Sequence, residues 1–246
     1  ALRRRRCEIL ALQLIGILAL SVLSLAPFSL LSAEGPYKLL KEIPVGGAAS
    51  WDYGSVDEAG RRLYMSHGTE VVVIDVDKDA VGGVISNTPG VHGLAPAPDL
   101  QKGYSSNGRE NKASVIDLKT DQPVWEVPFD MGVLTMSIES GPDGSARRIF
   151  VQLQGLGGFA VVDFAKRAEV QRIKFPEETT DFPPNTSHGS IVAPDGKTFW
   201  INYATANAVL VYSLPDLKPM GRVSLPVLNL PGRPAIGSGP QWLAFT

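Results

Sequence analysis

The chain has 246 residues, a formal net charge of −2 at neutral pH and a hydrophobic fraction of 44%. This length suits a domain with a sizeable core, and the balanced charges exclude a wholly disordered chain. The absence of a basic excess argues against nucleic acid as a partner. The single cysteine, Cys7, excludes an intramolecular disulfide and any CxxC metal or haem motif.

Residues 1–33 are predicted to be a targeting segment. Four arginines at positions 3–6 precede an uncharged apolar run over residues 9–33. This order is typical of a secretory signal peptide, and the small residues Ser32 and Ala33 fit a cleavage site. The run is also long enough to span a bilayer, so an uncleaved N-terminal anchor is the alternative. Both interpretations predict an exported protein (periplasmic, cell-surface or secreted) that contacts a membrane only through this segment if it is retained.

Residues 34–246 are predicted to be an all-β region made of one repeat. A motif of apolar runs recurs, with Asp75, Asp117 and Asp163 in equivalent places and Ser213 in the fourth. The runs are short, rich in Val, Ile, Tyr and Phe, and separated by Gly and Pro turns, which is typical of strands. Four antiparallel strands in each repeat of roughly 40–50 residues are typical of the blades of a β-propeller. The predicted blades are residues 46–85, 86–128, 129–175 and 176–225, and another begins in residues 226–246.

The number of repeats predicts an incomplete ring. Residues 239–246 match the first strand of a fifth blade, and residues 37–45 match an outermost strand. An open arc would expose sheet edges, so we expect either a truncated sequence or further blades supplied from elsewhere. A compact ring of four blades with a short tail is the alternative.

The repeats resemble those of the YVTN-repeat (YncE-like) propellers over about residues 36–246. Segments that carry the resemblance are Trp51-Asp52-Tyr53, Val72-Val73-Ile74-Asp75, Pro89-Gly90-Val91-His92-Gly93 and Pro194-Asp195-Gly196-Lys197. The resemblance implies a seven-bladed ring, usually exported, from which this chain departs in its number of repeats. It is more specific for the fold than for a function.

Candidate ligand-binding residues lie on the predicted face where one end of the central channel opens, because loops on a rigid scaffold carry function. Trp51, His92 and His188 are predicted to hold equivalent places at the start of the first strands, with Met136 interrupting the series in the third blade. The loops between second and third strands are expected to add the polar side chains of His67, Asn107 and Arg109. The candidates are Trp51, Asp52, His67, His92, Asn107, Arg109, His188 and Trp242.

The leading hypothesis is an exported scaffold that binds a small ligand or a protein at this channel mouth. No cofactor is predicted; His92 and His188 could hold a transition metal through imidazole nitrogens, or could simply bond neighbouring blades. No GxSxG, HExxH or Walker A motif occurs. The alternative is an enzyme, either a lactonase-like hydrolase or a redox subunit similar to those of amine dehydrogenases. Asp75, Asp117 and Asp163 are predicted to cap turns.

Overall fold

The computed structural model describes residues 37–141, 146–155, 157–176, 187–227, 231, 239–241 and 243–245. The predicted targeting segment and Trp242 lie outside this range. The chain divides into two compact units, Ala1–Glu42 and Ile43–Thr246. Residues 37–42, the described part of the first unit, contain no helix or strand. Within the described part of the chain, no helix combines the length and hydrophobicity needed to cross a membrane.

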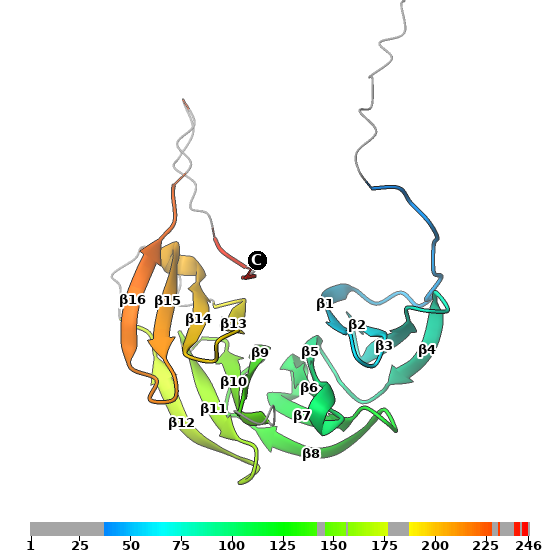
Figure 1. Ribbon diagram of the computed structural model, residues 1–246, viewed down its shortest axis with the longest axis horizontal. Helices are drawn as coiled ribbons and strands as arrows, with labels where there is room; N and C mark the ends of the chain where they lie inside the picture. The colour runs from blue at the N-terminus through cyan, green and yellow to red at the C-terminus, as the bar shows by residue number, and fades with distance from the viewer. Residues whose placement is uncertain are drawn as a thin grey trace, which may run out of the picture. The chain divides into compact units, whose positions relative to one another are not determined.

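Four antiparallel sheets of four strands each make up the second unit (Figure 1). Strand order in space follows chain order in every sheet, so successive strands pair through short turns. The first sheet contains β1 Trp51–Asp57, β2 Arg62–His67, β3 Glu70–Asp75 and β4 Ala80–Ile85; the second contains β5 Val91–Ala97, β6 Lys102–Asn107, β7 Lys112–Asp117 and β8 Gln122–Pro128. The third contains β9 Val133–Ser140, β10 Ala146–Leu153, β11 Gly158–Asp163 and β12 Ala168–Lys174; the fourth contains β13 Ser190–Val192, β14 Thr198–Tyr203, β15 Ala208–Ser213 and β16 Pro219–Ser224. Short 3-10 turns are η1 Pro98–Leu100, η2 Gly108–Glu110 and η3 Ala204–Ala206.

Apolar side chains form a core layer between each pair of neighbouring sheets. Successive side chains of a strand point to opposite faces. Phe150 therefore packs toward the fourth sheet, with its ring 4.3 Å from that of Phe199, whereas Val151 joins the layer that contains Tyr104 of the second sheet. Because an inner sheet contributes to two layers, its strands are apolar on both faces, as the sequence runs indicate.

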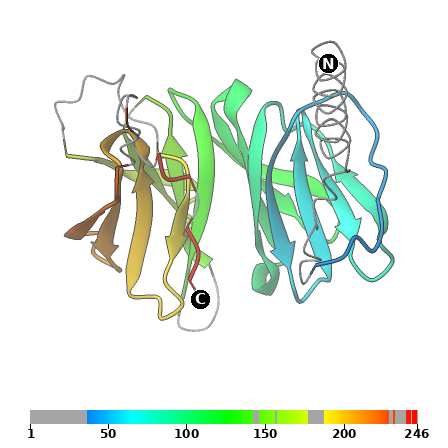
Figure 2. The same ribbon diagram turned by 90° about the horizontal axis from the view of Figure 1, so that it is seen from above.

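The first strands of the four sheets line a common axis (Figures 1 and 2). β1 contacts β5, β5 contacts β9, and β9 contacts β13. Hydroxyl groups join neighbours: Ser55 donates to the carbonyl of Leu94, and the hydroxyls of Ser137 and Ser190 lie 2.5 Å apart. All four strands line one hollow of about 230 Å³, through Gly54, Leu94, Met136 and Ser190 among others. The sheets are therefore four blades of an incomplete β-propeller, as the repeats predict.

Two predicted strands are not formed by the residues that the structure describes. Residues 37–45, predicted as an outermost strand, have no strand structure. The described residues 239–241 and 243–245, predicted to begin a fifth blade, are not in a strand either, although Leu243 lines the hollow between the first strands. A strand needs a neighbour to complete its backbone hydrogen bonds, and no described strand pairs with either segment.

Candidate functional site

Irregular pairing changes the direction of side chains near the start of the first strands. In β1, Trp51 pairs with His67 and Gly54 pairs with Met65, so two residues of β1 lie opposite Ser66 alone. The same irregularity occurs in β5 and β9. A β-bulge of this kind re-aims a side chain and is common beside functional sites.

The register identifies which residues of the four blades are equivalent. Gly54, Leu94, Met136 and Ser190 pair with corresponding residues of the second strands. Two residues earlier, the four blades carry Asp52, His92, Leu134 and His188. The predicted series was therefore wrong in two places: Asp52, not Trp51, corresponds to the histidines, and Leu134, not Met136, interrupts the series. Three blades present an ionisable side chain at one repeat position.

Asp52 and His92 form a pair between the first two blades. Nδ1 of His92 lies 2.8 Å from Oδ2 of Asp52, and about a third of each side chain is exposed. The carboxylate therefore accepts the Nδ1 hydrogen, which leaves Nε2 of neutral His92 as a hydrogen-bond acceptor. Gly108 lies beside this nitrogen, because a Cβ atom there would be 2.7 Å from Nε2.

His188 lies within electrostatic reach of this pair. Burial lowers the pKa of His188, the Asp52 carboxylate opposes that shift, and His92 adds to the lowering. The carbonyl of His188 accepts a hydrogen bond from the hydroxyl of Thr135 in β9, which ties the fourth blade to the third. The structure thus brings together Asp52, His92 and His188, which lie far apart in the sequence.

A hollow of about 350 Å³ opens beside the Asp52–His92 pair, and we call it the mouth hollow. Arg109, an exposed residue of η2, and Gln154, from the third blade, also line it. Three blades therefore contribute to it a carboxylate, an imidazole, a guanidinium and an amide. These groups can donate and accept hydrogen bonds and can bind a charged ligand.

The other described candidates have different positions. His67 and Asn107 end β2 and β6, so their predicted location in loops is wrong. His67 is 3% exposed and stacks on Trp51, with 4.3 Å between ring centroids. Asn107 is fully buried and donates to the hydroxyl of Ser114 at 2.8 Å. Neither His67 nor Asn107 lines the mouth hollow.

The second strands contain a buried polar position that was not predicted from the sequence. Each second strand carries a fully buried polar residue one place before the end of the strand: Ser66, Ser106, Gln152 and Asn202. In the second blade, the Ser106 hydroxyl accepts a hydrogen bond from the bulged Gly93 N–H at 3.2 Å. A bulge leaves backbone groups unpaired, and a polar side chain opposite can satisfy them. In three blades this polar residue lies opposite the bulge, so its recurrence is a signal that could have located the bulges.

Among the described residues, no three His, Cys, Asp or Glu side chains are grouped so that they could hold one ion. Glu139, a carboxylate of β9, is 6% exposed and is bound through both oxygens by Arg148.

Comparison with known proteins supports the fold. No protein-family model matches the sequence, and no curated protein matches it. Among solved structures, the chain is similar to hydrazine synthase of Kuenenia stuttgartiensis, a protein that contains a β-propeller, with a TM-score of 0.55 and 20% sequence identity. The match covers 69% of this chain and 49% of that one, so the chain spans about half the length of its neighbour. At this identity the likeness shows the fold alone. Membership of the YVTN-repeat group stays a prediction.

Proposed function

We propose that this part of a propeller binds a small ligand in the mouth hollow, as an exported scaffold of the YVTN-repeat kind. The observation that carries the proposal is the use of one repeat position, near the start of the first strands, for an ionisable side chain in three blades: Asp52, His92 and His188. Residues that only maintain a repeat tend to be the same in each copy or apolar. Here the position is ionisable in three of the four blades, and two of those residues, Asp52 and His92, line a cavity of small-molecule size. Export is supported by the arginine-flanked apolar segment of residues 1–33.

The experiment is a fragment screen on the intact chain, read from the imidazole NMR signals of its three histidines. Binding at the mouth hollow should shift the His92 signals most, and Asp52→Asn should weaken that binding at least tenfold. Asp99→Asn is the matched control, since Asp99 is an exposed carboxylate in η1 and does not line the hollow. Fragments that bind equally well to both variants, or that leave His92 unchanged, would reject the proposal.

Catalysis is a second candidate function, favoured by the 2.8 Å contact between Asp52 and His92. A carboxylate that fixes one imidazole nitrogen leaves the other to act as a general base, the arrangement needed to activate water against a lactone carbonyl. In that reaction Nε2 would take the proton of the attacking water. A panel of simple lactones tests this: hydrolysis above background that His92→Gln abolishes would support it, and the absence of such hydrolysis would exclude a lactonase.

A further inference from the structure

Arg109 is a cation without a carboxylate partner in the described structure. Four other described arginines, Arg61, Arg62, Arg148 and Arg172, each form an ion pair with an Asp or Glu. Glu110, the neighbour of Arg109 in sequence, is paired instead with Lys112 at 2.7 Å. Among the described residues, none forms an ion pair with Arg109, which lines the mouth hollow together with Asp52 and His92. Its guanidinium can therefore bind a carboxylate through two parallel hydrogen bonds.

Two glycines hold Arg109 next to His92. Gly90 has a φ of +69°, and a Cβ atom there would lie 2.6 Å from Cγ and 2.8 Å from the backbone nitrogen of Arg109. A Cβ atom at Gly108, which precedes Arg109, would likewise lie too close to Nε2 of His92. Backbone hydrogen bonds fix the approach, since Gly108 donates to the Gly90 carbonyl at 3.0 Å and Arg109 donates to that of Pro89 at 3.2 Å. The two loops are thus packed as closely as their backbones allow, which places the backbone of Gly108 and Arg109 beside the His92 imidazole.

The charges of the mouth hollow select among anions. The negative charge of Asp52 and the positive charge of Arg109 offset each other, and Gln154 is neutral. A singly charged carboxylate fits this balance better than a dianion such as phosphate, which would also face the Asp52 carboxylate. Nε2 of His92 accepts a hydrogen bond from a hydroxyl when neutral and donates one to a keto oxygen when protonated.

From this geometry we propose that the ligand of the mouth hollow is a small 2-hydroxy or 2-oxo monocarboxylate. Its carboxylate binds Arg109, and its adjacent oxygen binds Nε2 of His92, whose orientation Asp52 fixes. This inference rests on the proposed function and names the ligand class of that same site.

The test is calorimetric titration of the intact chain with lactate, pyruvate, propionate and inorganic phosphate. Lactate or pyruvate should bind saturably, and propionate, which lacks the second oxygen, should bind at least tenfold more weakly. Arg109→Gln should weaken lactate or pyruvate binding at least tenfold. Arg147→Gln should not, because Arg147 is an exposed arginine of β10 that does not line the mouth hollow.

Several results would overturn the inference. These are equal binding of propionate, tighter binding of phosphate, or no effect of Arg109→Gln. The proposed function and the carboxylate assignment can fail independently. If fragments shift the His92 signals while none of the four anions binds, the binding site is supported and the carboxylate assignment is wrong. If neither fragments nor anions bind, both are wrong. Thermal unfolding of each variant verifies that a loss of binding is not a loss of folding.

Discussion

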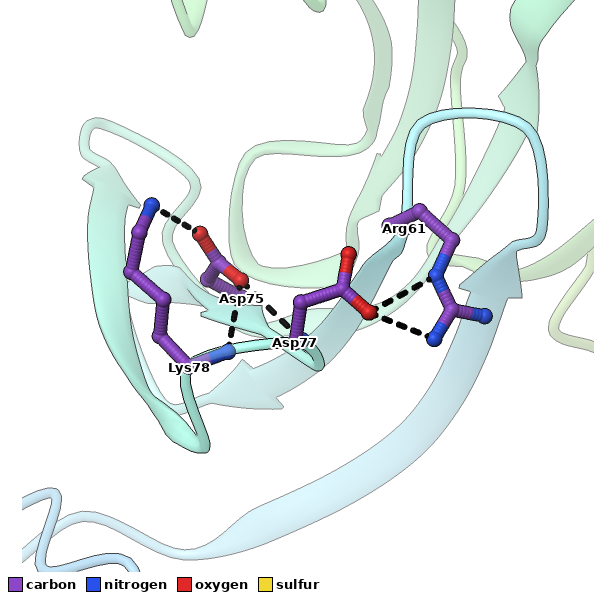
Figure 3. Close-up of polar contacts among 4 residues, drawn as sticks. All are labelled: Arg61, Asp75, Asp77 and Lys78. Atoms are coloured by element: carbon purple, nitrogen blue, oxygen red, sulfur yellow. Dashed lines mark hydrogen bonds and ion pairs between the residues drawn. The ribbon is translucent and has the colours of Figure 1, made fainter.

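The two ends of the blades differ in how regular the repeats are. At the end away from the mouth hollow, which we call the turn end, each Asp that closes a third strand binds the turn after it. At the mouth, equivalent positions carry different residues from blade to blade. Oδ1 of Asp75 accepts hydrogen bonds from the N–H groups of Asp77 and Lys78, and Arg61 binds Asp77 from the neighbouring turn (Figure 3). Asp117 and Asp163 bind their own turns in the same way, which confirms the predicted caps.

This difference separates structural residues from candidate functional ones. A repeated residue with the same local partner in every copy maintains the repeat. One position near the start of the first strands has no such common partner, because successive blades carry Asp52, His92, Leu134 and His188 there. Variation at a fixed position of a repeat is therefore a better guide to the site than repetition.

The largest effect on stability is expected at the turn end, in the third blade. Glu139 is buried, and Arg148 binds both of its oxygens. Glu139→Ala leaves a largely buried guanidinium unpaired, so the free energy of unfolding should fall by about 3 kcal/mol. Urea unfolding followed by circular dichroism measures this change. A loss below about 1 kcal/mol would mean that water replaces the pair and that this end is less rigid than the geometry indicates.

A glycine at each end provides a matched comparison. Gly90 at the mouth and Gly196 in a turn have φ values of +69° and +67°. An Ala at either position should cost about 1–2 kcal/mol in left-handed backbone strain. Only Gly90→Ala also pushes against Arg109, because nothing lies within 4 Å of a Cβ atom at Gly196. Gly90→Ala should therefore be the less stable variant and the one that loses fragment binding; equal stability and binding in the two variants would contradict the described packing.

The two ends should respond to acid in different pH ranges. Burial lowers the pKa of His188 below its ordinary 6.5 in the folded chain. As the pH falls, this histidine is therefore protonated in the unfolded chain before it is protonated in the folded chain. The stability that is present above pH 6.5 is lost as the pH falls below that value. The side-chain bond from Lys102, helped by the turn N–H groups, lowers the pKa of Asp117 from 3.8 to about 2, so its contribution is lost only below pH 3.8. Chemical unfolding between pH 8 and 3 should show that His188→Gln reduces the loss between pH 7 and 5, whereas Asp117→Asn leaves it unchanged. An identical pH profile for His188→Gln and the unmodified chain would contradict the burial of His188.

The smallest effect is expected for the exposed pair in Figure 3. Arg61 and Asp77 lie 2.6 Å apart, but both side chains are more than half exposed. Solvent and salt screen such a pair, so Asp77→Asn should leave the melting temperature unchanged within error. A clear drop would show that these turns contribute to stability beyond their local hydrogen bonds.

The sequence predicted the blades well because their strands depend on local patterns. Runs such as Val71–Val73 and turns such as Pro194-Asp195-Gly196 specify strands and their connections without knowledge of distant residues. The site was predicted only in part. The bulge after Trp51 adds one residue to β1, and hydrophobic alternation does not reveal it, so Trp51 was matched to His92 in place of Asp52.

Contacts between blades could not be predicted from the sequence either. The contact of Asp52 with His92 joins residues forty positions apart and depends on how the first two blades pack. For the same reason the glycine contact between Gly90 and Arg109 could not be predicted, since it depends on the distance between two loops.

The gathering of Asp52, His92 and His188 at one channel mouth is tested most directly by NMR titration of the His188 imidazole. In the unmodified chain its pKa should lie below 6.5. Asp52→Asn should lower this pKa further, because it removes a negative charge that favours protonated His188, and Asp99→Asn should leave it unchanged. A His188 pKa that is the same with and without the Asp52 charge would show that the first and fourth blades do not meet around a shared mouth.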